Sequence, residues 1–180
     1  MEHKIKSLLK EKKFIVIAID GMSGAGKTTY ANQLALKLNA NLIHMDDFFL
    51  PTNLKTEKRL QMPGGNIHYE RFQTEIIDHL NEDIHYQRWD CDEKKFTPSI
   101  SLKKNNVLII EGVYALHPSF GKYYDLSIFM KIDDNTQIKR ISSRNPSKAK
   151  QFFSEWIPLE NKYFKEFEIE KNCDFIIDTP

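Results

Sequence analysis

Phe14-Ile-Val-Ile-Ala-Ile-Asp-Gly-Met-Ser-Gly-Ala-Gly-Lys-Thr28 is the stretch that decides the fold class of this 180-residue chain. Its first part, residues 14–19, is a continuous apolar run, which is typical of a parallel strand buried on both faces. A glycine-rich turn follows, and helical spacing of apolar residues predicts a helix over 28–38. The positions that give this spacing are Ala31, Leu34, Ala35 and Leu38. A buried strand that passes through a tight turn into a helix indicates an α/β fold.

The turn itself, Gly21-Met-Ser-Gly-Ala-Gly-Lys-Thr28, fits the pattern G-x-x-x-x-G-K-[ST] without a mismatch. We call residues 21–28 the phosphate loop, because glycines there let backbone N–H groups and a helix N-terminus converge on phosphate oxygens. Lys27 is expected to reach the β- and γ-phosphates, and the Thr28 hydroxyl to bind magnesium. A turn that merely joins strand to helix is the alternative. The predicted nucleotide-binding residues are Gly21, Ser23, Gly24, Ala25, Gly26, Lys27, Thr28 and Thr29.

The rest of the chain alternates strands with helices. Further strands are predicted over 41–45, 107–110, 126–132 and 175–177, with short strands between 84 and 103. Helices are predicted over 2–12, 69–80, 135–143 and 151–169, and a loop with at most a helical turn over 51–66. With right-handed crossovers, this order predicts a three-layer fold: a mostly parallel central sheet covered by helices on both faces. We expect a single domain over 1–180, with a small lid near 139–155.

Composition narrows the function classes. Twenty-six basic and 25 acidic residues give a net charge of +1, so no nucleic-acid partner is expected. No apolar stretch reaches the length of a membrane span, and no membrane partner is expected. Cys91 and Cys173 have no metal or redox spacing and fit free thiols in a reducing cytosol. We therefore expect a soluble, cytoplasmic protein, and homo-oligomerisation stays open.

Acidic residues follow two of the predicted strands. His44-Met-Asp-Asp-Phe-Phe-Leu-Pro51 places two carboxylates after the second strand, where ligands of such sheets bind. One of them is expected to accept the proton of an attacking hydroxyl, and an acidic turn with a capping Asp is the alternative. Glu111 ends the 107–110 strand and is expected to contact magnesium, unless it is only a loop residue. No guanine-specifying N-K-x-D segment is present, which favours a kinase over a GTPase.

Together these residues resemble the uridine kinase-like group of P-loop kinases, which includes nucleoside, nicotinamide riboside, phosphoribulose and pantothenate kinases. The resemblance covers nearly the whole chain. It rests on 21–29, Asp46-Asp-Phe-Phe49, Glu111-Gly112, Arg140 with Arg144, Trp156-Ile-Pro158 and Tyr163. It implies ATP as phosphoryl donor with Mg²⁺ as cofactor and Asp46 as catalytic base. It also implies that Asp46 joins Thr28 and Glu111 around the metal, with Asp47 secondary.

Five cations lie within residues 139–150 without an acid among them. A solvated helix face is one interpretation. The resemblance makes the segment a lid, in which Arg140 and Arg144 neutralise charge on the transferring phosphoryl group. Asn145-Pro-Ser-Lys-Ala-Lys150 stands where typical uridine kinase lids carry a second arginine-rich element. The resemblance also implies an acceptor pocket, formed by Asp46, Phe49, His68, Tyr69, Arg71, Trp89 and Asp90.

Our leading hypothesis is an ATP-dependent kinase that phosphorylates a hydroxyl of a small molecule, with a nucleoside such as uridine or cytidine as acceptor. Nicotinamide riboside or another small alcohol is the alternative within the same chemistry. A non-catalytic nucleotide-binding regulatory protein is the alternative of another class. A polynucleotide kinase is disfavoured by the near-neutral charge.

Overall fold

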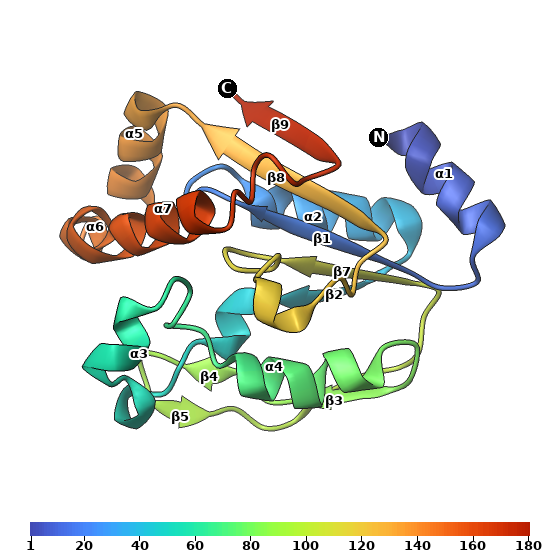
Figure 1. Ribbon diagram of the computed structural model, residues 1–180, viewed down its shortest axis with the longest axis horizontal. Coiled ribbons are helices and arrows are strands. Elements are labelled where there is room, and N and C mark those ends of the chain that lie inside the picture. The colour runs from blue at the N-terminus through green and yellow to red at the C-terminus, as the bar shows by residue number, and fades with distance from the viewer.

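A five-stranded parallel sheet forms the centre of the protein (Figure 1). The computed structural model describes all 180 residues. The strand order is β2-β7-β1-β8-β9, and every neighbouring pair is parallel. The strands are β1 (Ile15–Gly21), β2 (Asn41–His44), β7 (Val107–Glu111), β8 (Leu126–Ile132) and β9 (Phe175–Thr179). The predicted parallel sheet is confirmed.

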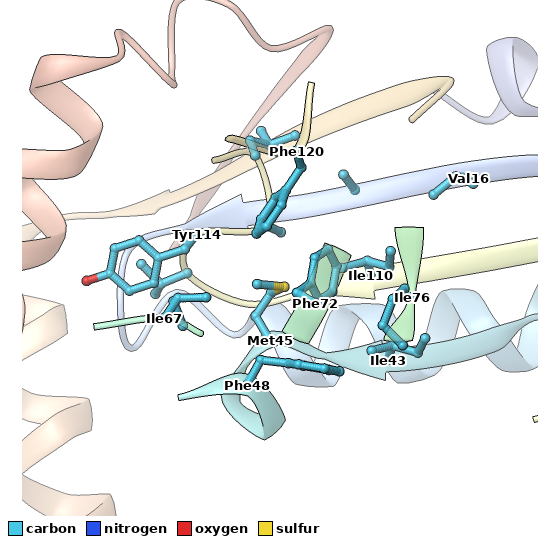
Figure 2. Close-up of a cluster of buried hydrophobic side chains, with 14 of the residues drawn as sticks. Val16, Ile43, Met45, Phe48, Ile67, Phe72, Ile76, Ile110, Tyr114 and Phe120 are labelled. Atoms are coloured by element: carbon cyan, nitrogen blue, oxygen red, sulfur yellow. The ribbon is translucent and has the colours of Figure 1, made fainter. Parts of the chain in front are cut away.

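The three inner strands of the sheet, β7, β1 and β8, are buried on both faces, because their successive side chains alternate between two apolar clusters. In β1, Val16 and Ala18 join one cluster, whereas Ile15, Ile17 and Ile19 join the other. Helices α1 (Glu2–Glu11) and α2 (Lys27–Leu38) cover the second cluster. The first cluster is covered by α4 (Tyr69–Glu75) and α7 (Ile157–Glu166). Figure 2 shows part of this first cluster, with Phe48, Phe72 and Tyr114 among its larger side chains.

The remaining helices are α3 (Glu57–Gln61), α5 (Asp134–Arg144) and α6 (Ala149–Gln151). Two predicted helices differ from the structure. The helix expected over 69–80 ends at Glu75, and a 3₁₀ turn over Ile77–His79 follows. The β-branched side chains of Thr74, Ile76 and Ile77 reduce helix propensity at this break.

The helix expected over 151–169 is interrupted and shorter. A π-helical turn, Phe152–Trp156, joins α6 to α7, which ends at Glu166. Pro158 lies in the first turn of α7. It lacks the N–H that would continue an α-helical bond pattern from the preceding turn, so a regular α-helix cannot run through it.

Two small antiparallel pairs lie outside the central sheet: β3 (Ile84–Tyr86) with β6 (Ile100–Leu102), and β4 (Trp89–Asp90) with β5 (Lys95–Phe96). Both β4 and α4 pack against a 3₁₀ turn over Met45–Phe48, which follows β2. None of the helices is long and apolar enough to cross a membrane.

Candidate active site

The carboxyl ends of three neighbouring strands bring the predicted functional segments together. Glu111, the last residue of β7, is in register with Ile19 of β1 and with His44 of β2. The phosphate loop begins at the end of β1, and the acidic 3₁₀ turn begins directly after His44. The edge at which ligands bind in such sheets therefore carries the loop, Glu111 and the Asp46–Asp47 pair.

Glycine is required where the phosphate loop leaves the sheet. Gly21 has φ +136°, and a Cβ there would lie 2.0 Å from the backbone oxygen of Met130 in β8. Gly26 takes the left-handed conformation, with φ 85°, immediately before α2. Only glycine adopts both conformations without strain.

The loop carries a row of unused hydrogen-bond donors. The backbone N–H groups of Gly21, Met22, Ser23 and Ala25 all have partners within the protein. In contrast, no bond within the protein is made by the backbone N–H groups of Gly24, Gly26, Lys27, Thr28 and Thr29. The first N–H groups of any helix lack partners within that helix, and here two glycines of the preceding turn add further free donors. Such a cluster of donors at a helix N-terminus suits an anion.

Lys27 is nearly buried and its ammonium is held by the loop itself. Its Nζ donates to the carbonyl oxygens of Gly21 at 2.8 Å and Met22 at 3.0 Å. This places a positive charge over the first half of the loop.

Glu111 connects the loop to the end of β2. Its Oε1 accepts from the Thr28 hydroxyl at 3.1 Å and lies 2.5 Å from His44 Nδ1. The hydrogen bond to Glu111 raises the pKa of His44, although partial burial opposes this. No group of three or more His, Cys, Asp or Glu side chains forms a metal site alone. The oxygens of Thr28 and Glu111 suit Mg²⁺, which takes few protein ligands and completes its shell with phosphate oxygens and water.

The two neighbouring aspartates occupy different environments. Asp46 is exposed to solvent, but the protein atoms crowded around it and the Glu111 carboxylate both raise its pKa. Asp47 is buried and accepts a hydrogen bond from the Tyr86 hydroxyl at 3.2 Å. Burial raises the pKa of Asp47 as well. Asp46 is thus the acid that a bound molecule can reach, and Asp47 is anchored inside the protein.

The residues expected to form the acceptor pocket surround the 3₁₀ turn, but most of them have structural partners. Phe49 pairs with Ile67 in an isolated β-bridge. The His68 ring accepts from the Arg71 backbone N–H at the start of α4, and burial lowers its pKa. The Tyr69 ring lies against the Arg59 guanidinium, 3.6 Å from its centre.

The other three members lie near the β4–β5 hairpin. Arg71 pairs with Glu75 and donates to the carbonyl of Gln87, while its Nη1 is buried without a partner. The Trp89 ring packs edge-on against Phe96. Asp90 accepts from the backbone N–H groups of the hairpin turn, which lowers its pKa.

A cavity of about 390 Å³ opens beside these segments. It is lined by Leu50, Arg59, His68 and Glu70, among others. Of the predicted acceptor residues only His68 lines it, and neither the phosphate loop nor Asp46 does.

The two arginines of the predicted lid differ in their contacts. Arg140 donates to the backbone carbonyl of Gly24 at 3.1 Å and to that of Pro180. Arg144 is exposed at the end of α5, and its side chain makes no hydrogen bond or ion pair within the protein. Beyond it, Lys148 forms a 2.7 Å ion pair with Asp92 in the β4–β5 hairpin. This pair joins the predicted lid to the hairpin.

Several named proteins that are similar to this chain in sequence are kinases. A uridine kinase of Ureaplasma parvum is 24% identical over 176 residues, which covers 88% of this chain and 84% of the relative. A nicotinamide riboside kinase of Saccharomyces cerevisiae is 28% identical over 189 residues, covering 90% of this chain and 77% of the relative. A solved structure of a possible uridine kinase from Bacillus stearothermophilus superposes with a TM-score of 0.68. That match covers 98% of both chains at 20% identity. No protein-family model matches the chain.

The chain is a relative of the uridine kinase-like P-loop kinases. Its three-layer α/β architecture is that of a P-loop kinase, as the sequence predicts.

In this P-loop kinase relative, Asp20 is a buried polar side chain beside the loop that sequence reasoning missed. It accepts from the backbone N–H groups of Gly21, Tyr114 and Leu116 and from the Tyr163 hydroxyl. Burial nevertheless raises the pKa of Asp20 to about 6. A polar residue at the end of an apolar strand run was the available signal.

Glu160 of α7 and Gln137 of α5 are two further missed residues, and both bind Ser23. Nothing in the sequence marks them, because they reach the loop from more than 110 residues away, at sequence separations of 137 and 114. His44 was part of the quoted motif, but its contact with Glu111 depends on the strand register.

Proposed function

We propose that this protein is a Mg²⁺- and ATP-dependent phosphotransferase that acts on a hydroxyl group of a small molecule, with a nucleoside such as uridine or cytidine as acceptor. The binding of ATP is supported by the five free backbone N–H groups in the phosphate loop and at the adjoining Thr29. Such donors, with Lys27 beside them, suit the phosphates of a nucleoside triphosphate.

The carboxylates support transfer rather than binding alone. Asp46 is exposed and close enough to Glu111 for that carboxylate to raise its pKa, which makes Asp46 a better proton acceptor than an ordinary aspartate. In the proposed reaction, Asp46 accepts the proton of the acceptor hydroxyl. The hydroxyl oxygen forms a bond to the γ-phosphorus of ATP, and the bond between that phosphorus and the β–γ bridging oxygen breaks to release ADP. Thr28 and Glu111 would hold Mg²⁺, which neutralises charge on the phosphates when bound.

Positioning of the phosphoryl group would fall to the loop and the lid. Lys27 would contact the β- and γ-phosphates, and Arg144 is free to turn toward the γ-phosphate. Arg140 already lies against Gly24 of the loop. Preorganised positive charge of this kind lowers the barrier to phosphoryl transfer without covalent participation of the protein.

The acceptor is assigned from the relatives' names and from the segments around the 3₁₀ turn. Relatives named uridine kinase and nicotinamide riboside kinase both support a ribose-bearing acceptor. Trp89 and Arg71 carry an aromatic face and an unpaired buried N–H group, which suit a stacked base and a polar ring atom. Nicotinamide riboside is the second acceptor to test.

A panel assay tests the proposal. Purified protein with Mg²⁺ and ATP is incubated with uridine, cytidine, nicotinamide riboside, pantothenate and ribulose 5-phosphate. ADP release and phosphorylated product are both followed. Turnover on one nucleoside, lost in Asp46→Asn, is the expected result. ATP binding without turnover on any acceptor would favour a regulatory nucleotide-binding protein instead.

A further inference from the structure

Ser23, in the middle of the phosphate loop, is held from two helices. Its backbone N–H donates to Glu160 Oε2 at 3.1 Å, and its hydroxyl donates to Glu160 Oε1 at 2.6 Å. Its carbonyl oxygen accepts from Gln137 Nε2 at 2.7 Å. Every polar group of Ser23 is therefore bound by a side chain of α7 or α5.

These contacts divide the donors of the loop into two sets. Up to Ser23, each backbone N–H is taken by the protein, whereas Gly24 and residues 26–29 keep theirs free. Glu160 forms the border between the sets. The Glu160 carboxylate accepts from the backbone N–H of Ser23, the residue before the first free donor, Gly24. A carboxylate is an anionic acceptor of hydrogen bonds, as are the phosphate oxygens that we expect at the free donors.

Burying the Glu160 carboxylate at this position costs free energy unless hydrogen bonds or a nearby positive charge stabilise it. Glu160 is only 5% exposed, and burial raises its pKa. Its two bonds from Ser23 and the nearby Lys27 charge offset that burial. A side chain that only filled space would be apolar here, because a buried acid destabilises unless it is bonded.

The same face of α7 makes a second contact with this region. Tyr163 lies three residues after Glu160 and donates its hydroxyl to Asp20 at 2.8 Å. Residues 20 and 23 are thus both tied to α7, on either side of the sharp turn at Gly21. The loop is fixed to a helix that continues from the predicted lid (Figure 1).

We propose that Glu160 is a positioning residue of the phosphate loop, which fixes Ser23 so that the free N–H groups of Gly24 and residues 26–29 converge on the transferred phosphoryl group. This inference rests on the proposed function, because it assigns Glu160 a part in ATP-dependent transfer. It makes hydrogen-bond geometry, and not the negative charge, the property of Glu160 that matters.

The test compares Glu160→Ala with Glu160→Gln, in steady-state kinetics with ATP and the acceptor varied separately. Gln can still accept from the Ser23 N–H and donate to its hydroxyl oxygen, whereas Ala can do neither. We expect Glu160→Ala to lower kcat/KM for ATP about tenfold or more, since small misplacements of reacting groups are costly. Glu160→Gln should stay within about threefold of wild type, and the acceptor KM should not change in either variant.

Glu166→Ala is the matched control, since Glu166 lies on the same helix, is exposed and has no bonding partner. Ser23→Ala, a smaller change, covers the case in which Glu160→Ala does not fold. Its combination with Glu160→Ala should lose less than the sum of the single effects, because both remove one contact. Equal losses in the Ala and Gln variants, or strict additivity with Ser23→Ala, would overturn the positioning role. A wild-type protein that binds no ATP would instead overturn the proposed function, and this inference with it.

Discussion

The hydrogen bond from Tyr163 to Asp20 gives a prediction whose size follows from the structure. Tyr163→Phe removes one hydroxyl and leaves the ring, which packs against Tyr114 and His117 in the core. The Asp20 carboxylate then loses one of four donors in a fully buried site. A hydrogen bond to a charged group contributes about 1.5–3 kcal/mol, so we expect the free energy of unfolding to fall by about 2 kcal/mol.

The loss should depend on pH in a defined direction. The pKa of Asp20 is about 6 in the folded protein, above its ordinary value of 3.8. Because its folded pKa is raised, Asp20 contributes stability below about pH 4 that is lost as the pH rises through about 6. The Tyr163 hydroxyl favours the ionised form and reduces that loss. The effect of Tyr163→Phe should therefore be largest above pH 6 and smaller at pH 5.

Urea and thermal unfolding at pH 5 and pH 7.5 measure this. For a chain of this length, about 2 kcal/mol corresponds to a decrease in Tm of about 4–8 °C. Tyr123→Phe is the matched control, because its hydroxyl donates to the neutral carbonyl of Ala115. That loss should be nearer 1 kcal/mol and should change less with pH, because the Tyr123 hydroxyl makes no hydrogen bond to Asp20. An equal loss at both pH values would refute the assignment of Asp20 as the charged partner.

Three further predictions concern the proposed reaction. Asp46→Asn should lower turnover more than a hundredfold while ATP binding by calorimetry stays near wild type, because the amide cannot accept the hydroxyl proton; near-normal turnover would exclude Asp46 as the base. Lys27→Ala should weaken ATP binding and lower kcat together, since it removes both the phosphate contact and the bonds that hold Gly21 and Met22; unchanged kinetics would contradict the role of the loop. Arg144→Gln should lower kcat about tenfold or more with little change in thermal stability, because Arg144 has no partner within the protein; an unchanged kcat would remove it from the lid chemistry.

Local sequence patterns were sufficient for the sheet and for the phosphate loop. The apolar runs at 14–19 and 107–110 allow little besides buried parallel strands, and Gly21 and Gly26 stand where the chain needs glycine. The end of a helix is set by weaker preferences. Ile76 shows this, because the apolar stripe continues through it although the regular helix ends at Glu75. In the same way, the helical path continues from residue 149 into α7, but a π-helical turn interrupts the regular helix before Pro158.

The side chains that support the loop could not be predicted, because their partners are distant in the sequence. In the sequence, Glu160 cannot be distinguished from the other acidic residues of a polar helix. Only the packing of α7 against the loop brings its carboxylate to Ser23. For the predicted acceptor residues, the sequence does suggest a role, but the same residue types are also common in the core. An aromatic side chain at Tyr69 or Trp89 suits packing as well as the expected recognition of a substrate, and the structure gives each of them a packing partner within the protein.

The π-helical turn over Phe152–Trp156 sets the angle by which α7 is rotated about the helix axis relative to α6. A π turn contains one residue more than an α turn, and each residue of an α-helix turns the chain by about 100°. If that residue were absent, α7 would be rotated by about 100° relative to the segment that carries Lys148. Glu160 and Tyr163 could then reach Ser23 and Asp20 only if Lys148 lost its contact with Asp92. The extra residue therefore sets an angle and not a length. It lets one helical path hold Lys148 against Asp92 and Glu160 against Ser23.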